Sequence, residues 1–187
     1  MKLIKAKEGI KKLVVTTNGY KLDKLAERFL ETGVDGINIS IDSLDRNKFK
    51  EITGHDRLPE ILEGIKILQS KGFHNIKVNA VLLKNINDTK EEFDRWEEFI
   101  NNNKINFRYI ELMQTGDNLD YFKRYHQSAK VFREYIESKG WKNIDRARDD
   151  GPALNYINES TKGKFGVIAP YYKDFCKTCN RLRITAK

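Results

Sequence analysis

Residues 75–112 read NIKVNAVLLKNINDTKEEFDRWEEFINNNKINFRYIEL, and this stretch predicts the fold class of the chain. Its first part, 75–83, alternates apolar and polar residues as a β-strand does. Asp88 or Thr89 then caps a helix whose apolar residues recur at helical spacing. A second strand pattern follows at 105–112. Strand, helix and strand in this order predict a parallel unit, and therefore an α/β fold.

The same kind of unit recurs on both sides of this stretch. We predict further strands at 13–17, 36–41 and 164–169, and helices at 22–30, from Pro59 to Leu68, and at 127–139. This alternation indicates an α/β sheet or barrel for residues 1–126. Residues 127–187 are expected to form a second, smaller and less regular region.

Two of the predicted strands carry polar residues on one side. Asn38 and Ser40 oppose an apolar side in 36–41, and Lys77 and Asn79 do so in 75–83. An antiparallel sheet with one wet face would make these residues ordinary surface. The helix between each pair of strands argues against that, because parallel strands are covered on both faces. We therefore interpret the polar side chains as the lining of a barrel lumen that holds a ligand.

The composition excludes several classes of protein. Apolar residues make up 39% of the 187 residues and charged residues 33%, which is typical of a folded domain. No run of apolar residues approaches the roughly 18 that a transmembrane helix needs, and the N-terminus lacks a signal peptide, so no membrane partner is expected. Two cysteines are too few for a disulfide scaffold, and a reducing, cytoplasmic location is expected.

Near its C-terminus the chain reads FCKTCNRLRIT. Cys176 and Cys179, the two cysteines of the sequence, supply half of a metal site. Taken alone, such a pair is a redox pair or half of a zinc site. Arg181 and Arg183 follow at strand spacing within a basic tail. A basic tail of this kind suits a polyphosphate or a nucleic acid.

Several motifs together resemble the GTP 3′,8-cyclases, the radical S-adenosylmethionine (SAM) enzymes of molybdenum cofactor biosynthesis. In chain order they are TTNG (16–19), INISIDSLD (37–45), ITG (52–54), KVNAVLLKNIND (77–88), RYIELMQTG (108–116), GPA (151–153) and FGVIAPYYKDFCKTCNRLRIT (165–185). The resemblance covers nearly the whole chain, and its last motif is the most specific.

The resemblance implies a partial (β/α)6 barrel, of which this chain would form about the last four βα units plus a small irregular C-terminal region. It implies a first 4Fe–4S cluster with S-adenosylmethionine, and a second 4Fe–4S cluster held by three cysteines. In this family the adenosyl radical removes a hydrogen atom from C3′ of GTP, and the C3′ radical attacks C8 of the guanine.

The family also implies roles for particular residues. The expected contacts are Ser40, Asn79 and Met113 for S-adenosylmethionine; Thr16, Lys77, Arg181, Leu182 and Arg183 for GTP; and Cys176 and Cys179 for the second cluster. The first-cluster CxxxCxxC and the third cysteine of the second cluster are absent from the sequence. We therefore expect the chain to be an internal part of the enzyme, inactive by itself.

One alternative comes from a different class of protein. A non-enzymatic relative could use the CxxC and the basic tail to bind zinc or a nucleic acid. Only two zinc ligands are present, and a nucleic acid is not expected because the chain shows weak candidates for base stacking. GTP is the expected partner, and a homodimer is a further expectation.

Overall fold

The structure is a computed structural model that describes residues 1–145 and 151–172. Its strands form one sheet in the order β1-β2-β3-β4-β7-β6-β5. Their bounds are Val14–Thr17 (β1), Gly36–Ser40 (β2), Ile76–Leu82 (β3), Asn106–Glu111 (β4), Lys142–Ile144 (β5), Leu154–Ile157 (β6) and Lys164–Ile168 (β7). The first four strands and β7 pair in parallel, so the antiparallel interpretation of the polar strands is wrong. Only β5 and β6 add antiparallel pairs among the described strands.

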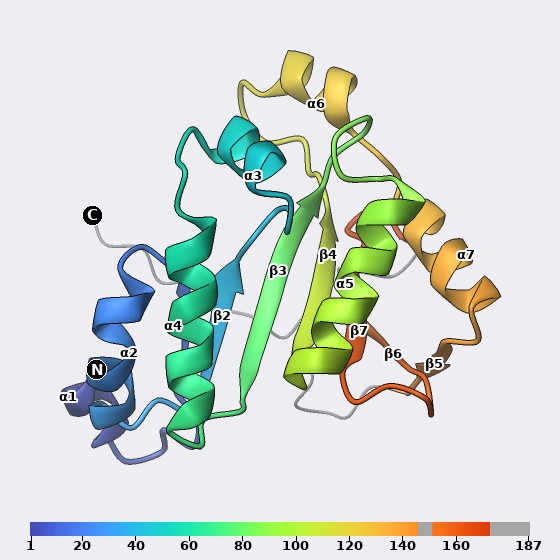
Figure 1. Ribbon diagram of the computed structural model, residues 1–187. Helices are drawn as coiled ribbons and strands as arrows, with labels where there is room; N and C mark the ends of the chain where they lie inside the picture. Colours follow the sequence, from blue (N-terminus) through green and yellow to red (C-terminus); the bar gives the residue numbers. More distant parts are fainter. Residues whose placement is uncertain (146–150, 173–187) are drawn as a thin grey trace.

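The helices lie mainly on one face of this sheet. Their bounds are Lys2–Lys5 (α1), Leu22–Glu31 (α2), Arg46–Thr53 (α3), Leu58–Ser70 (α4), Lys90–Asn103 (α5), Leu119–Tyr125 (α6) and Lys130–Ser138 (α7). Figure 1 shows α2, α4 and α5 in front of the sheet, with α3 and α6 above the ends of the strands. In the described parts of the chain, no helix has the length and apolar character needed to cross a bilayer.

The predicted elements are confirmed, and their ends have clear causes. The side chain of Thr89 caps α5 by accepting the N–H of Glu92, and Pro59 lies in the first turn of α4. The sequence did not predict α3, which begins where Asp45 accepts the N–H groups of Asn47 and Lys48. It also did not predict α6, β5 and β6.

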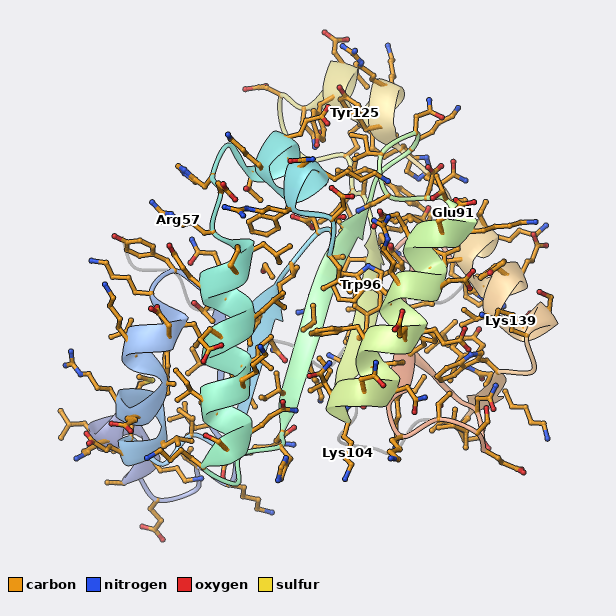
Figure 2. The ribbon with its side chains drawn as sticks, viewed as in Figure 1. Arg57, Glu91, Trp96, Lys104, Tyr125 and Lys139 are labelled. Carbon is orange, nitrogen blue, oxygen red and sulfur yellow. The ribbon has the colours of Figure 1, made fainter. Side chains whose placement is uncertain are left out.

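The core lies between the sheet and the helix layer. Trp96 points from α5 toward the sheet and stacks on Phe107 of β4, with ring centroids 3.9 Å apart (Figure 2). Phe165 of β7 packs edge-on against Phe107, at 6.0 Å between centroids. These three side chains are almost fully buried. Because β7 joins the same core and the same sheet as β4, the sheet continues through both predicted regions, and a boundary after residue 126 stays a prediction.

Candidate functional site

Figure 1 shows α2, α4 and α5 on one face of the sheet, and we call the opposite face the luminal face. It carries two rows of mostly polar residues. Alternate residues of a strand share a face, and the register aligns them across the strands. The first row is Thr16, Asn38, Lys77, Asn106 and Lys164. The second row is Ser40, Asn79, Arg108, Gly166 and Asn155. The polar strand residues predicted from the sequence therefore lie side by side.

Two residues of the first row are hydrogen-bonded to each other. The side-chain amide of Asn38 donates a hydrogen bond to the hydroxyl of Thr16 at 3.2 Å. Ser40, Lys77 and Asn79 are half-buried, whereas their neighbours on the other face of β2 and β3 are fully buried. This contrast is the one that the alternating sequence predicted.

A polar cavity of about 210 Å³ opens where the luminal rows cross β3, β4 and β7, and we call it the basic cavity. Three cations and three asparagines line it. The cations are Lys77, Arg108 and Lys164, and the asparagines are Asn75, Asn106 and Asn155. Guanidinium and ammonium groups that line one cavity suit an anion with several oxygens.

Arg108 and Lys164 were not among the predicted site residues. The signal for Arg108 was present, because it alternates with the buried Phe107 and Tyr109 along β4. Lys164 could not be assigned in advance, since its place beside Asn106 depends on the long-range pairing of β7 with β4.

At the carboxyl-terminal side of the luminal face, Asn79 presents an acceptor that nothing in the described structure satisfies. Its Oδ1 atom is buried and has no hydrogen-bond partner among the described residues. A buried carbonyl oxygen without a donor is costly, so a ligand hydroxyl or amine is the fitting partner. Ser40 lies opposite Asn79 in the register. Both side chains therefore fit a polar small molecule.

A second cavity, of about 190 Å³, adjoins this side of the face. It is lined by Asn18, Tyr20, Ser40, Asp42, Phe49, Thr53, His55, Arg57 and Ile61. Burial raises the pKa of Asp42. The backbone N–H of Val81 donates a hydrogen bond to the Asp42 carboxylate at 2.8 Å, which lowers this pKa in part. Ser40 is therefore accessible from a cavity that also offers polar and charged side chains.

Asn87 fixes the ends of the strands that carry these residues. Its side-chain amide donates to the carbonyls of Asp42 and Val81, both at 2.8 Å, and its Oδ1 accepts the N–H of Leu83 at 2.7 Å. The hydroxyl of Tyr109 donates to the Asn87 carbonyl at 3.0 Å. Asn87 is fully buried, so we call this set of bonds the Asn87 interlock. It joins the ends of β2, β3 and β4, and no pattern in the sequence predicts it.

The loop after β2 has a second anchor. Glu92 of α5 is buried and accepts hydrogen bonds from Ser43 and Lys48, each at 2.9 Å, and from Arg95 at 3.1 Å. A buried carboxylate is tolerated when donors surround it in this way. The loop that follows Ser40 is therefore held to α5.

Met113 lies just beyond β4, where its side chain is 48% exposed. The Asn118 side chain donates to the Met113 carbonyl at 3.1 Å, and the next N–H, of Gln114, donates to the Tyr171 hydroxyl at 2.9 Å. The backbone around Met113 is therefore fixed while its side chain stays accessible at the carboxyl-terminal side of the sheet.

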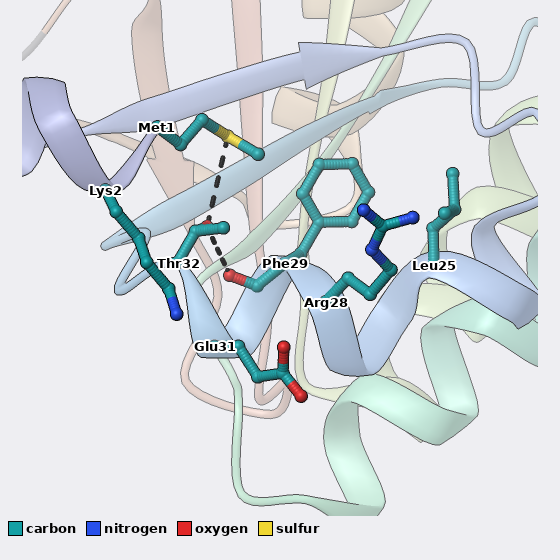
Figure 3. A pocket seen from close by; sticks show the side chains of 7 residues that line it. All are labelled: Met1, Lys2, Leu25, Arg28, Phe29, Glu31 and Thr32. Carbon is teal, nitrogen blue, oxygen red and sulfur yellow. Dashed lines mark hydrogen bonds between the residues drawn. The ribbon is translucent and has the colours of Figure 1, made fainter.

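The larger cavity of about 450 Å³ between α1 and α2 contains none of the predicted site residues (Figure 3). It is lined by Met1, Lys2, Leu25, Arg28, Phe29, Glu31 and Thr32. The Thr32 hydroxyl turns back to its own helix and donates to the Phe29 carbonyl at 2.7 Å. This cavity lies beside the helix layer, so it is not part of the luminal face.

The structure thus brings Thr16 and Lys77 into one row, and Ser40 and Asn79 into the next. The predicted residues Cys176, Cys179, Arg181, Leu182 and Arg183 lie outside the described residues. Within residues 1–145 and 151–172, no three His, Cys, Asp or Glu side chains are grouped as a metal site would require.

Curated relatives match almost the whole chain. A GTP 3′,8-cyclase from Stenotrophomonas maltophilia is 46% identical over 98% of this chain and 56% of its own length. Those of Mannheimia succiniciproducens and Klebsiella pneumoniae are 45% and 40% identical, again over 98% of this chain. The chain therefore spans about half the length of the curated relatives it matches.

Solved structures share the fold at low sequence identity. A radical SAM methyltransferase from Sphaerobacter thermophilus matches with a TM-score of 0.58 and 14% identity, over 72% of this chain and 40% of its own. Streptococcus suis SuiB, solved with S-adenosylmethionine, matches with a TM-score of 0.52 and 20% identity, over 69% and 29% of the two chains. The partial (β/α) barrel is therefore of the radical SAM type.

Two family models divide the chain between them. The Molybdenum Cofactor Synthesis C family matches residues 105–187, and the Radical SAM superfamily matches residues 1–100. The Radical SAM match covers more than half of the chain, from its start through β1 to most of α5. The chain belongs to the radical SAM superfamily.

Proposed function

We propose that this chain is the substrate-binding part of a GTP 3′,8-cyclase, a radical SAM lyase that converts GTP to (8S)-3′,8-cyclo-7,8-dihydroguanosine 5′-triphosphate in molybdopterin biosynthesis. The observation that carries the proposal is the luminal face. It presents a basic cavity at one side and an unsatisfied acceptor, Asn79 Oδ1, at the other. Relatives with that activity are 40–46% identical to the chain.

The basic cavity suits the triphosphate of GTP. Lys77, Arg108 and Lys164 supply positive charge, and Arg108 offers a planar fork that binds phosphate oxygens in pairs. Thr16, in the same row as Lys77, offers a hydroxyl. We assign Arg181, Leu182 and Arg183 to the same nucleotide, as the family motif implies.

The other side of the face suits S-adenosylmethionine, which supplies a 5′-deoxyadenosyl radical that removes a hydrogen atom from the substrate. Ser40 and Asn79 would hold its polar groups, and Met113 would pack against it. Met113 is exposed at that side and can supply apolar contact. Cys176 and Cys179 would ligate the second 4Fe–4S cluster.

The spacing of these residues would bring the two ligands next to each other. Lys77 and Asn79 are two residues apart on β3, which separates them by about 7 Å along the strand. A hydrogen atom passes between two groups only when they are in contact. A nucleotide at Lys77 and a cofactor at Asn79 would meet that condition without movement of the sheet.

No observation favours the alternative of a zinc- or nucleic-acid-binding relative. A cytoplasmic location belongs to the proposal, because thiolate-bound clusters need a reducing compartment. A homodimer stays a prediction.

The proposal is tested by comparing two proteins in the presence of GTP, S-adenosylmethionine and a reductant. One is the 187-residue chain alone, and the other is the full-length protein, meaning the chain with the flanking segments that its longer relatives carry. The chain alone is expected to release no 5′-deoxyadenosine above a control without protein, because its two cysteines cannot ligate the clusters. The full-length protein is expected to release 5′-deoxyadenosine and the cyclised nucleotide together.

Two results would contradict this. Release of 5′-deoxyadenosine by the chain alone would show that the missing ligands are not needed. Cleavage of S-adenosylmethionine by the full-length protein with GTP left intact would show a radical SAM enzyme that acts on another substrate.

A further inference from the structure

Gly166 occupies an unusual place for a glycine. It lies inside β7, where it pairs with Arg108 of β4 on one side and with Asn155 of β6 on the other. Glycine in the interior of a strand weakens the sheet, and it often marks a place where another group approaches closely. Gly166 therefore lowers the stability of β7, and another feature of the structure has to explain why a glycine stands there.

Backbone conformation does not explain this glycine. Gly166 is absent from the glycines with positive φ in the described structure, so its backbone angles are open to residues with a side chain. The explanation must lie in the space above its Cα.

That space is taken by Arg108. A Cβ atom built at Gly166 would lie 2.7 Å from Cγ of Arg108, and 3.4 Å from both its Cδ and its Nε. Non-bonded carbon atoms prefer about 3.5–4.0 Å. The Arg108 side chain therefore lies across β7, and it contacts Gly166 near its root. Moving only the guanidinium end would not relieve the clash that a methyl group would cause.

The path of this side chain determines the shape of the basic cavity. Arg108, Gly166 and Asn155 form one row, and all three line the cavity. With a glycine at the centre of the row, the arginine side chain lies across β7 and lines the cavity. A larger residue there would force Arg108 out of this path and so change the position of its charge in a cavity of about 210 Å³.

We propose that Gly166 is a positioning residue for the phosphates of the bound nucleotide, because a glycine leaves room for the Arg108 side chain to lie across β7, where it lines the basic cavity. This inference rests on the proposed function and assigns Gly166 a part in it. Gly166 itself touches the arginine and acts through it.

The test is a double-mutant cycle in the full-length protein, with Gly166→Ala, Arg108→Ala and the double variant. Equilibrium dissociation constants are measured for GTP, inorganic tripolyphosphate, guanosine and S-adenosylmethionine at fixed salt. Gly166→Ala is expected to raise the constants for GTP and tripolyphosphate about tenfold, as loss of a charge-assisted contact does. The constants for guanosine and S-adenosylmethionine are expected to stay within about twofold.

The double variant separates positioning from general disruption of the strand. In the Arg108→Ala background the arginine side chain that would clash with the new methyl group is gone. Gly166→Ala is therefore expected to weaken tripolyphosphate binding no further. An equal loss in both backgrounds would overturn the proposal, and so would unchanged tripolyphosphate binding by Gly166→Ala itself. If Gly166→Ala fails to fold, recovery of folding in the Arg108→Ala background would support the clash, and failure in both would overturn it.

The parent protein distinguishes this inference from the function on which it rests. A parent that binds neither GTP nor tripolyphosphate would overturn the proposed function and the role of Gly166 together. A parent that binds both, with Gly166→Ala unaffected, would overturn the role of Gly166 alone.

Discussion

Replacing both Arg181 and Arg183 with alanine in the full-length protein is expected to raise the dissociation constant for GTP more than about a hundredfold. Each guanidinium can make charge-assisted hydrogen bonds to phosphate worth roughly 1.5–3 kcal/mol, and a loss of about 1.4 kcal/mol is tenfold in affinity. The two arginines are two residues apart, so an extended backbone would direct them to the same side. The measurement is equilibrium binding of GTP and S-adenosylmethionine at fixed salt.

Two control variants sharpen this result. Replacing the arginines with lysine should recover only part of the affinity, because lysine keeps the charge but loses the planar fork. Ser40→Ala should show the opposite selectivity and weaken S-adenosylmethionine more than GTP. Arginine variants that bind GTP as the parent does would mean that the basic tail is a solvated surface or a nucleic-acid patch.

The Asn87→Ala substitution is expected to lower the free energy of unfolding by roughly 3 kcal/mol or more, since each buried polar group left without a partner costs about 1–3 kcal/mol. The substitution removes three hydrogen bonds. The N–H of Leu83 and the carbonyls of Asp42 and Val81 then lose the Asn87 side chain as their partner. Urea unfolding followed by tryptophan fluorescence measures the change, because Trp96 is buried in the same core.

Matched variants show whether the interlock itself is responsible. Tyr109→Phe removes only the hydroxyl that donates to the Asn87 carbonyl, and should cost about 1 kcal/mol. Asn102→Ala changes an exposed asparagine in the last turn of α5 and should stay within about 0.5 kcal/mol. Unfolding of Asn87→Ala at the same urea concentration as the parent would show that these bonds do not hold the strand ends.

The parts of the fold that alternate regularly could be predicted from the sequence. In β3 every second residue faces the helices and is buried, so its period of two is visible without any knowledge of its neighbours. The same holds for β2, and the period of two predicts that Ser40, Lys77 and Asn79 share one face of the sheet, as they do. Helix α5 was equally clear, because a capping threonine precedes its buried stripe.

Other parts depend on contacts between distant residues. Only Phe49 is buried in α3, so that helix has almost no apolar period to detect. The basic cavity needs β7 beside β4, a pairing between residues more than fifty positions apart in the sequence. Asn87 resembles any asparagine in a turn until its buried bonds are seen.

The proposal that the luminal face holds the phosphates of GTP is tested most directly by titrating GTP into the double variant Lys77→Ala/Arg108→Ala of the full-length protein. The control is Lys66→Ala/Lys130→Ala, which removes two charges from lysines that are 70% and 73% exposed on the outer helices. At physiological salt, charges more than about 8 Å from a ligand are largely screened. The luminal variant is therefore expected to lose at least about a hundredfold in GTP affinity, and the outer variant less than about twofold. Equal losses in both variants, or no loss in the luminal one, would contradict the assignment of this face to GTP.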